Sequence, residues 1–134
     1  MPTIVRKSFS TLLETRRDVV HTLRWQVQST LWRPPTDVYE TSENFVVRVE
    51  VAGMRDEDFE VALQNNTLLI AGFRPNTNNE RRAYQQMEIG FGRFEIMVDV
   101  LVPVHVEAAT AEYKDGFLTI TLPKSKPKQI RVDN

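Results

Sequence analysis

The sequence contains no cysteine among its 134 residues, which excludes disulfides, thiolate nucleophiles and thiolate metal sites. Its two histidines, His21 and His105, lack the short spacing that is typical of metal ligands. The 17 Lys and Arg residues are balanced by 18 Asp and Glu, so no overall positive field attracts nucleic acid. No apolar run approaches the roughly 20 residues of a membrane span, and no signal-peptide pattern is visible. We therefore expect a cytoplasmic protein.

Motifs that carry chemistry are also missing. The sequence has no GxxxxGK(S/T), no GxGxxG and no GxSxG motif. Gly90-Phe91-Gly92 precedes a predicted strand rather than a helix, which makes it a poor phosphate cradle. The acidic cluster Asp56, Glu57 and Asp58 follows a turn and is typical of a solvated loop. We expect no cofactor, no metal and no enzymatic activity, which favours a binding or assembly protein.

Residues 1–33 form a segment with its own pattern. Val20, Leu23, Val27 and Leu31 recur at helical spacing, and the pair Pro34-Pro35 ends such a helix. This arm carries six basic and two acidic residues, a net charge of +4. Two interpretations stay open at this point: a helix packed on its own domain, and a membrane-surface helix or transit peptide, which the acidic residues Glu14 and Asp18 disfavour.

From residue 36 to about 123 the apolar residues recur at a period of two, which is typical of half-buried strands. Turn residues separate the runs, and no intervening stretch is long and periodic enough for a crossover helix. The pattern predicts an all-β fold, an antiparallel immunoglobulin-like β-sandwich. The residues expected on inward faces are Phe45, Val47, Val49, Val51, Phe59, Val61, Leu63, Phe94, Ile96, Val98, Val100, Leu118, Ile120 and Leu122.

Several stretches together resemble one family. Residues 111–124, AEYKDGFLTITLPK, closely resemble the A-x-x-x-n-G-x-L signature of the α-crystallin domain of small heat shock proteins. Residues 34–54 and 59–74 are similar to that family's second to fifth strands, and Ile130-Arg131-Val132 resembles its C-terminal I-x-I/V motif. Ile89 and Ile96 stand where the family often has Arg, which affects charge contacts at a dimer interface and not the fold.

The resemblance implies three segments and a function. The segments are a mostly helical N-terminal arm (1–33), an α-crystallin domain (34–123) and a C-terminal extension (124–134). The implied function is that of an ATP-independent chaperone that holds partly unfolded client proteins and prevents their aggregation during stress. ATP-driven chaperones would refold the clients. The expected client contacts are the apolar arm residues Leu12, Leu13, Val20, Leu23, Trp25, Val27, Leu31 and Trp32.

The resemblance also implies a homo-oligomer built from dimers. In bacterial, archaeal and plant members, the long polar segment carries a sixth strand that pairs with the partner's second strand. That exchanged strand corresponds here to Tyr84, Gln85, Gln86, Met87 and Glu88, and the receiving strand to Val38, Tyr39, Glu40 and Thr41.

The C-terminal motif has a simple physical interpretation. In an extended chain Ile130 and Val132 point the same way, so they form a two-pronged apolar face with Arg131 opposite. Such a segment can lie along an open sheet edge and place alternate side chains in pockets. The resemblance implies a groove between the fourth and eighth strands of a neighbouring subunit, for which the candidates are Val61, Leu63, Ala109 and Ala111.

Two alternatives remain open. A co-chaperone module of the CS type has a similar sandwich but normally lacks both the exchanged strand and the I-x-I/V tail. A membrane-surface role for the arm is compatible with chaperone activity. An assembly larger than a dimer distinguishes the first alternative, and binding to liposomes with and without residues 1–33 distinguishes the second.

Overall fold

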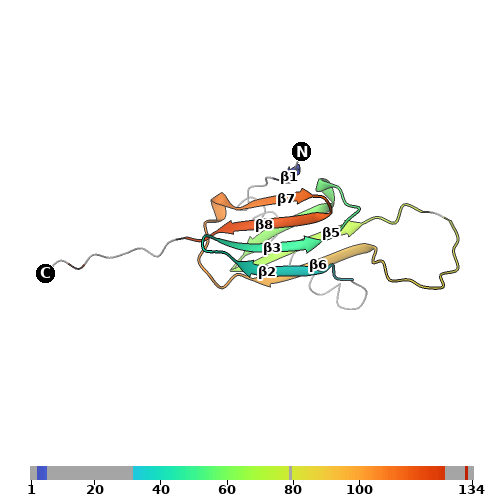
Figure 1. The fold of residues 1–134 in the computed structure, drawn as a ribbon, viewed down its shortest axis with the longest axis horizontal. Coiled ribbons are helices and arrows are strands. Elements are labelled where there is room, and N and C mark those ends of the chain that lie inside the picture. The colour runs from blue at the N-terminus through green and yellow to red at the C-terminus, as the bar shows by residue number, and fades with distance from the viewer. Residues whose placement is uncertain (1–2, 6–31, 79, 126–131, 133–134) are drawn as a thin grey trace.

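The computed structural model describes residues 3–5, 32–78, 80–125 and 132. Two antiparallel sheets pack face to face as a β-sandwich (Figure 1). The five-stranded sheet has the order β1-β7-β8-β3-β2, and the three-stranded sheet has the order β4-β5-β6. The strands are β1 (Thr3–Val5), β2 (Thr36–Glu40), β3 (Asn44–Glu50), β4 (Phe59–Gln64), β5 (Thr67–Arg74), β6 (Gly92–Asp99), β7 (Thr110–Lys114) and β8 (Phe117–Pro123).

The core lies between the two sheets and is made by the alternation that the sequence predicts. On β3 the residues Val47 and Val49 are fully buried, while Arg48 between them is exposed. Leu118, Ile120 and Leu122 of β8 and Phe94 and Ile96 of β6 are equally buried. All fourteen residues expected on inward faces belong to this core, and the predicted fold class is confirmed.

Tight turns join neighbouring strands at positions that the sequence marks. Asn65 and Asn66 connect β4 to β5 with φ of 49° and 63°, and Asp115 and Gly116 connect β7 to β8 with φ of 53° and 83°. Two successive residues with positive φ form the hairpin turn whose twist matches that of the strands. Asn, Asp and Gly tolerate this backbone at low cost, so local chemistry determines both hairpins.

The N-terminal segment differs from expectation where it is described. Thr3–Val5 form a short strand, β1, on the outer edge of β7, whereas the sequence pattern indicated no strand there. The helix predicted in the arm lies outside the described residues. The only helices in the described part of the chain are two single-turn 3-10 segments, η1 (Asp56–Asp58) and η2 (Val106–Ala108).

The long loop between β5 and β6 and the C-terminal extension leave the sandwich at opposite ends. Residues 75–91, between β5 and β6, project from one end as an extended loop (Figure 1). At the other end, the segment after β8 is held by backbone hydrogen bonds from Lys124 N to Glu43 O (2.8 Å) and from Ser125 N to Pro103 O (2.9 Å). The Lys124 ammonium also forms a 2.8 Å ion pair with Glu40, so the start of the C-terminal extension has a defined position.

Candidate interaction surfaces

The outer edge of β2 is the first candidate surface. β2 pairs with β3 over Thr36–Glu40, and no strand of the described residues pairs with its other edge. Val38 is 46% exposed and Tyr39 is 44% exposed on this strand. An edge strand with unpaired N–H and C=O groups is a template for strand addition. Of the residues predicted to receive a partner strand, Val38, Tyr39 and Glu40 lie on this edge strand, and Thr41 follows directly after it.

The loop of residues 75–91 is the second candidate surface. In the single chain, Tyr84 to Glu88 form no strand and are exposed. The loop nevertheless carries large apolar side chains, with Met87 65% exposed and Ile89 64% exposed. Exposed apolar groups on a polar loop indicate a contact surface. The exchanged strand remains a prediction, since pairing with a second chain is what would form it.

The base of this loop is held by a cluster that the sequence did not indicate. The indole N–H of Trp32 donates a hydrogen bond to the carbonyl oxygen of Gly92 (3.1 Å), and the ring packs edge-on against Phe94 with centroids 5.4 Å apart. Arg74, the last residue of β5, donates from Nε to the Gly90 carbonyl (2.8 Å). The arm's final aromatic residue is thus joined to both ends of the loop.

Trp32 therefore has a structural role in the single chain. It is partly buried and packs against the hydrophobic core. Its predicted role in client binding remains a prediction, as do those of the other seven arm residues, which lie outside the described residues.

The rim formed by β4 and β7 is the third candidate surface. The rings of Phe59 on β4 and Tyr113 on β7 lie 5.0 Å apart, so the two strands border the same side of the sandwich. Val61 and Leu63 are each 4% exposed and Ala111 is 2% exposed. Ala109 precedes β7 and packs against the core, partly buried. Val61, Leu63 and Ala111 belong to one core cluster, against which Ala109 packs, and both the groove and the binding of a tail there stay predictions.

The outer edge of β7 at this rim is occupied by β1. Val5 pairs with Ala111, Ile4 with Glu112 and Thr3 with Tyr113.

Of the predicted tail motif, Val132 is 83% exposed and Ile130 lies outside the described residues.

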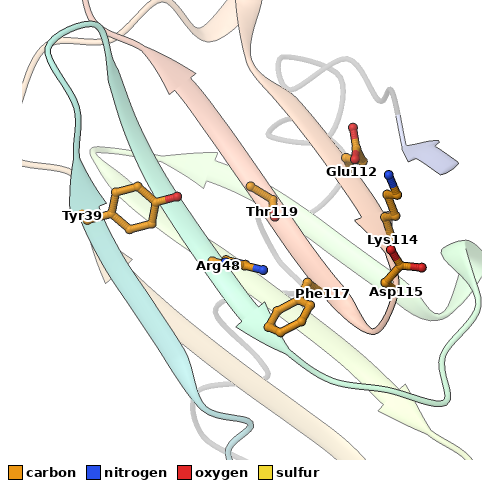
Figure 2. A pocket seen from close by; sticks show the side chains of 7 residues that line it. All are labelled: Tyr39, Arg48, Glu112, Lys114, Asp115, Phe117 and Thr119. Carbon is orange, nitrogen blue, oxygen red and sulfur yellow. The ribbon is translucent and has the colours of Figure 1, made fainter. Parts of the chain in front are cut away.

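The solvent face of the five-stranded sheet has a shallow hollow of about 380 Å³ (Figure 2). Its lining mixes charged and aromatic side chains, and the guanidinium carbon of Arg48 lies 4.0 Å from the centroid of the Phe117 ring. Sequence alternation places Arg48 and Thr119 on the outward face, but only the strand order brings them beside residues of β2 and β7. The lining residues are Tyr39, Arg48, Glu112, Lys114, Asp115, Phe117 and Thr119.

Among the described residues, no group of three His, Cys, Asp or Glu side chains is placed to hold a metal ion. No helix within the same residues is long and apolar enough to cross a membrane. Two acidic residues of η1 have local partners: the Asp58 carboxylate accepts a hydrogen bond from the Arg55 backbone N–H (2.9 Å), and the Glu57 carboxylate lies 3.6 Å from the Arg55 guanidinium.

The sequence matches the Hsp20/alpha crystallin family over residues 37–133, which span the sandwich and the C-terminal motif. This chain is a member of that family. The small heat shock protein C2 of Rickettsia felis is 27% identical over 99 residues, which are 73% of this chain and 64% of that protein. The chain thus aligns with less than two thirds of that relative's length. The family predicted from the signature residues is confirmed.

Solved structures of small heat shock proteins agree with the fold of this Hsp20 family member. Heat shock protein 16.0 from Schizosaccharomyces pombe superimposes with a TM-score of 0.63 at 28% identity, covering 76% of this chain and 99% of that chain. A small heat-shock protein from Xylella fastidiosa, described as having a distinct high order structure, gives a TM-score of 0.64 at 26% identity. The match covers 78% of this chain and all of the Xylella chain, given as 100%.

Proposed function

We propose that this chain is an ATP-independent chaperone of the cytoplasm that holds partly unfolded proteins and prevents their aggregation. The observation that carries the proposal is the family match, because it extends from β2 through to the C-terminal motif. The unpaired β2 edge, the apolar loop and the β4–β7 rim support it, since each is a candidate surface for assembly. No enzymatic activity is proposed.

The proposed dimer forms by exchange of strands. The loop of one chain lays Tyr84 to Glu88 along the partner's β2, and the partner's loop does the same in return. Two identical exchanges make a twofold dimer. Each exchange satisfies unpaired backbone groups of β2 and covers the exposed side chains of Val38, Met87 and Ile89. This arrangement protects an edge that would otherwise promote uncontrolled aggregation.

The proposed larger oligomer is held by C-terminal tails. Burying Ile130 and Val132 in a neighbour's β4–β7 rim contributes roughly 1.5–3 kcal/mol each. Ordering the tail and losing translational freedom offset much of this gain, so one tail alone binds no better than roughly millimolar. Several tails in a closed assembly act together through their high effective concentration. The oligomer then stays assembled and still exchanges subunits.

Client binding is proposed to use the apolar residues of the arm, together with the rim when a tail leaves it. Assembly hides these surfaces, and warming loosens the weak contacts that hide them. A held client would pass to ATP-driven chaperones for refolding.

The test is suppression of aggregation without nucleotide. Heat-labile citrate synthase is warmed alone, with the purified chain, and with an equal mass of an unrelated β-sandwich protein, while light scattering is recorded. The chain should suppress scattering at about one subunit per client subunit, and added ATP should change nothing. Scattering equal to that with the unrelated protein would refute the proposal.

The same preparation distinguishes the CS-type alternative. Native mass spectrometry should find assemblies larger than a dimer, with even numbers of subunits. A monomer or an isolated dimer would favour a co-chaperone module, because that type lacks the tail contacts.

A further inference from the structure

Strand β5 is buried on both of its faces. Leu69 and Ala71 alternate with the core residues of β5 and so point to the outer face of the three-stranded sheet, yet they are only 4% and 0% exposed. Neither belongs to the core cluster. On the outer face of the five-stranded sheet, Val46 is the one buried residue among those of β2, β3, β7 and β8. The outer face of β5 is therefore covered, up to Phe73, which is 54% exposed.

The covered area extends to the neighbouring strands. Directly paired residues of an antiparallel ladder share a face of the sheet, and Leu69 is paired with Ala62 on β4 and with Met97 on β6. Ala62 is 5% exposed. At outward positions of β6, the Nε atom of Arg93 and one carboxylate oxygen of Glu95 are shielded from solvent as well. The cover thus reaches across all three strands.

The described residues hold no element that lies over this face. Their strands all belong to the two sheets, and their two helices are single turns. The longest part of the chain outside them is residues 6–31, whose two ends are fixed on opposite sides of the sandwich (Figure 1). Val5 pairs with Ala111 of β7, which borders β4, and Trp32 donates a hydrogen bond to the Gly92 carbonyl of β6. The short way between these ends leads across β4, β5 and β6.

We propose that the outer face of β4, β5 and β6 is the docking site for the chain's own arm. A helix of residues 20–31 would measure about 18 Å, which is enough to cross three strands that together span roughly 10 Å. Ala62 and Ala71 have small side chains, so the sheet lets a helix approach closely there. The arm contacts the face through its helical stripe, Val20, Leu23, Val27 and Leu31.

The charges of the face suit a basic occupant. Ala71 is paired with Glu60 on one side and with Glu95 on the other, so two carboxylates flank it, with Arg93 as the nearby cation on β6. The arm carries a net charge of +4. The inference goes beyond the proposed function, because it concerns where the arm lies and not what it binds. In the proposed chaperone, a client and this face contact the same arm residues.

The test measures how fast trypsin cleaves the full-length chain after Arg24, which lies within the stripe. Cleavage requires the arm to leave the face, so its rate, followed by mass spectrometry, reports the fraction of time for which the arm is undocked. Leu69→Gln places a polar side chain of similar size on the face and adds no tryptic site. Thr121→Gln is the matched control, since Thr121 alternates with core residues on β8, the central strand of the other sheet.

We expect Leu69→Gln to speed cleavage after Arg24 about tenfold, because burial of one leucine contributes at least that factor to docking. Thr121→Gln should leave the rate unchanged. Cleavage after Arg48, within β3, should stay slow in every chain, as it does when the sandwich is folded. Equal rates for Leu69→Gln and the parent, or equal acceleration by both glutamines, would overturn the proposal.

A second variant changes the arm and leaves the sandwich intact. Val20→Gln with Val27→Gln should also speed the cleavage, and Leu69→Gln should add little in that chain, because the arm is already released. Unchanged cleavage in this arm variant would overturn the proposal even if Leu69→Gln failed to fold, and full additivity would do the same.

The protein concentration shows whose arm occupies the face. Protection by the chain's own arm does not depend on concentration, whereas protection lost on dilution would assign the face to the arm of a second copy and overturn the proposal. The aggregation assay with citrate synthase is independent of these rates, so a failure of the docking site is distinguishable from a failure of the proposed function.

Discussion

The guanidinium carbon of Arg74 lies 4.3 Å from the centroid of the Trp32 ring. The same guanidinium donates hydrogen bonds to the carbonyl oxygens of Gly90 and, at 3.2 Å, Ala52. Trp32 belongs to the end of the arm, Arg74 ends β5, and Gly90 closes the long loop. One cation thus ties the arm to the base of the loop that we propose for strand exchange.

Gly90 should not tolerate a side chain while Trp32 is present. A Cβ on Gly90 would lie 2.4 Å from ring atoms of Trp32, which is well inside van der Waals contact. We expect Gly90→Ala to lower the free energy of unfolding by about 1–3 kcal/mol, as overpacking does. Thermal unfolding followed by circular dichroism at fixed protein concentration measures it.

The control is the same substitution in a Trp32→Ala chain. There the clash is gone, and Gly90→Ala should change the midpoint little, which corresponds to a coupling of roughly 1 kcal/mol or more. Equal losses in both backgrounds would mean that the indole does not limit the space at Gly90.

Tyr113 joins the β7 strand to the end of β3 through its hydroxyl group. That hydroxyl donates to the Val51 carbonyl (2.8 Å) and accepts from the Met54 N–H (3.4 Å). Tyr113→Phe keeps the ring contact but leaves a buried carbonyl without this donor, at a cost of about 1–2 kcal/mol. We expect a lower midpoint of thermal unfolding.

Tyr84→Phe is the matched control for this substitution. The Tyr84 side chain is 50% exposed, and its hydroxyl accepts a 3.3 Å hydrogen bond from the exposed Arg82. The midpoint should not move. A similar decrease for both variants would argue against a special contribution from the Tyr113–Val51 hydrogen bond.

Removing most of the long loop should separate the proposed dimer. A chain without residues 76–86 keeps all eight strands but loses part of the segment that we propose to pair with a partner's β2. We expect monomers by native mass spectrometry and an unchanged β-sheet spectrum by circular dichroism. The control replaces residues 76–82 with Gly and Ser at constant length and should stay dimeric. A stable dimer of the deleted chain would contradict strand exchange.

Truncating the two prongs of the tail should dissociate larger assemblies. Ile130→Ala combined with Val132→Ala removes most of the apolar area that the tail would bury, so we expect dimers by multi-angle light scattering. Arg131→Ala is the control, since in an extended chain this residue faces away from the prongs. It should retain the parent mass. An unaltered mass for the double variant would exclude the tail as the link between dimers.

Much of the sandwich follows from local sequence signals. Alternation along β3, β6 and β8 marks the inward residues because successive side chains of a strand point to opposite faces. Asn65-Asn66 and Asp115-Gly116 mark two hairpins because few residues accept positive φ. The apolar face of the C-terminal motif was also predicted from this alternation, since two β-branched residues at a spacing of two share one face of an extended chain.

The stacking of Trp32 on Arg74 and the position of β1 beside β7 depend on contacts between parts of the chain that are distant in sequence. Trp32 and Arg74 are both visible as residues, but their stacking requires that β5 and the loop's return strand be neighbours. Likewise, the sequence of Thr3–Val5 contains no turn that leads to β7, and only the order of strands leaves that edge for it. Periodicity and turn chemistry act over a few residues and so determined strands, core faces and hairpins. Which edges remain open, and which segment covers them, is decided only when the two sheets pack.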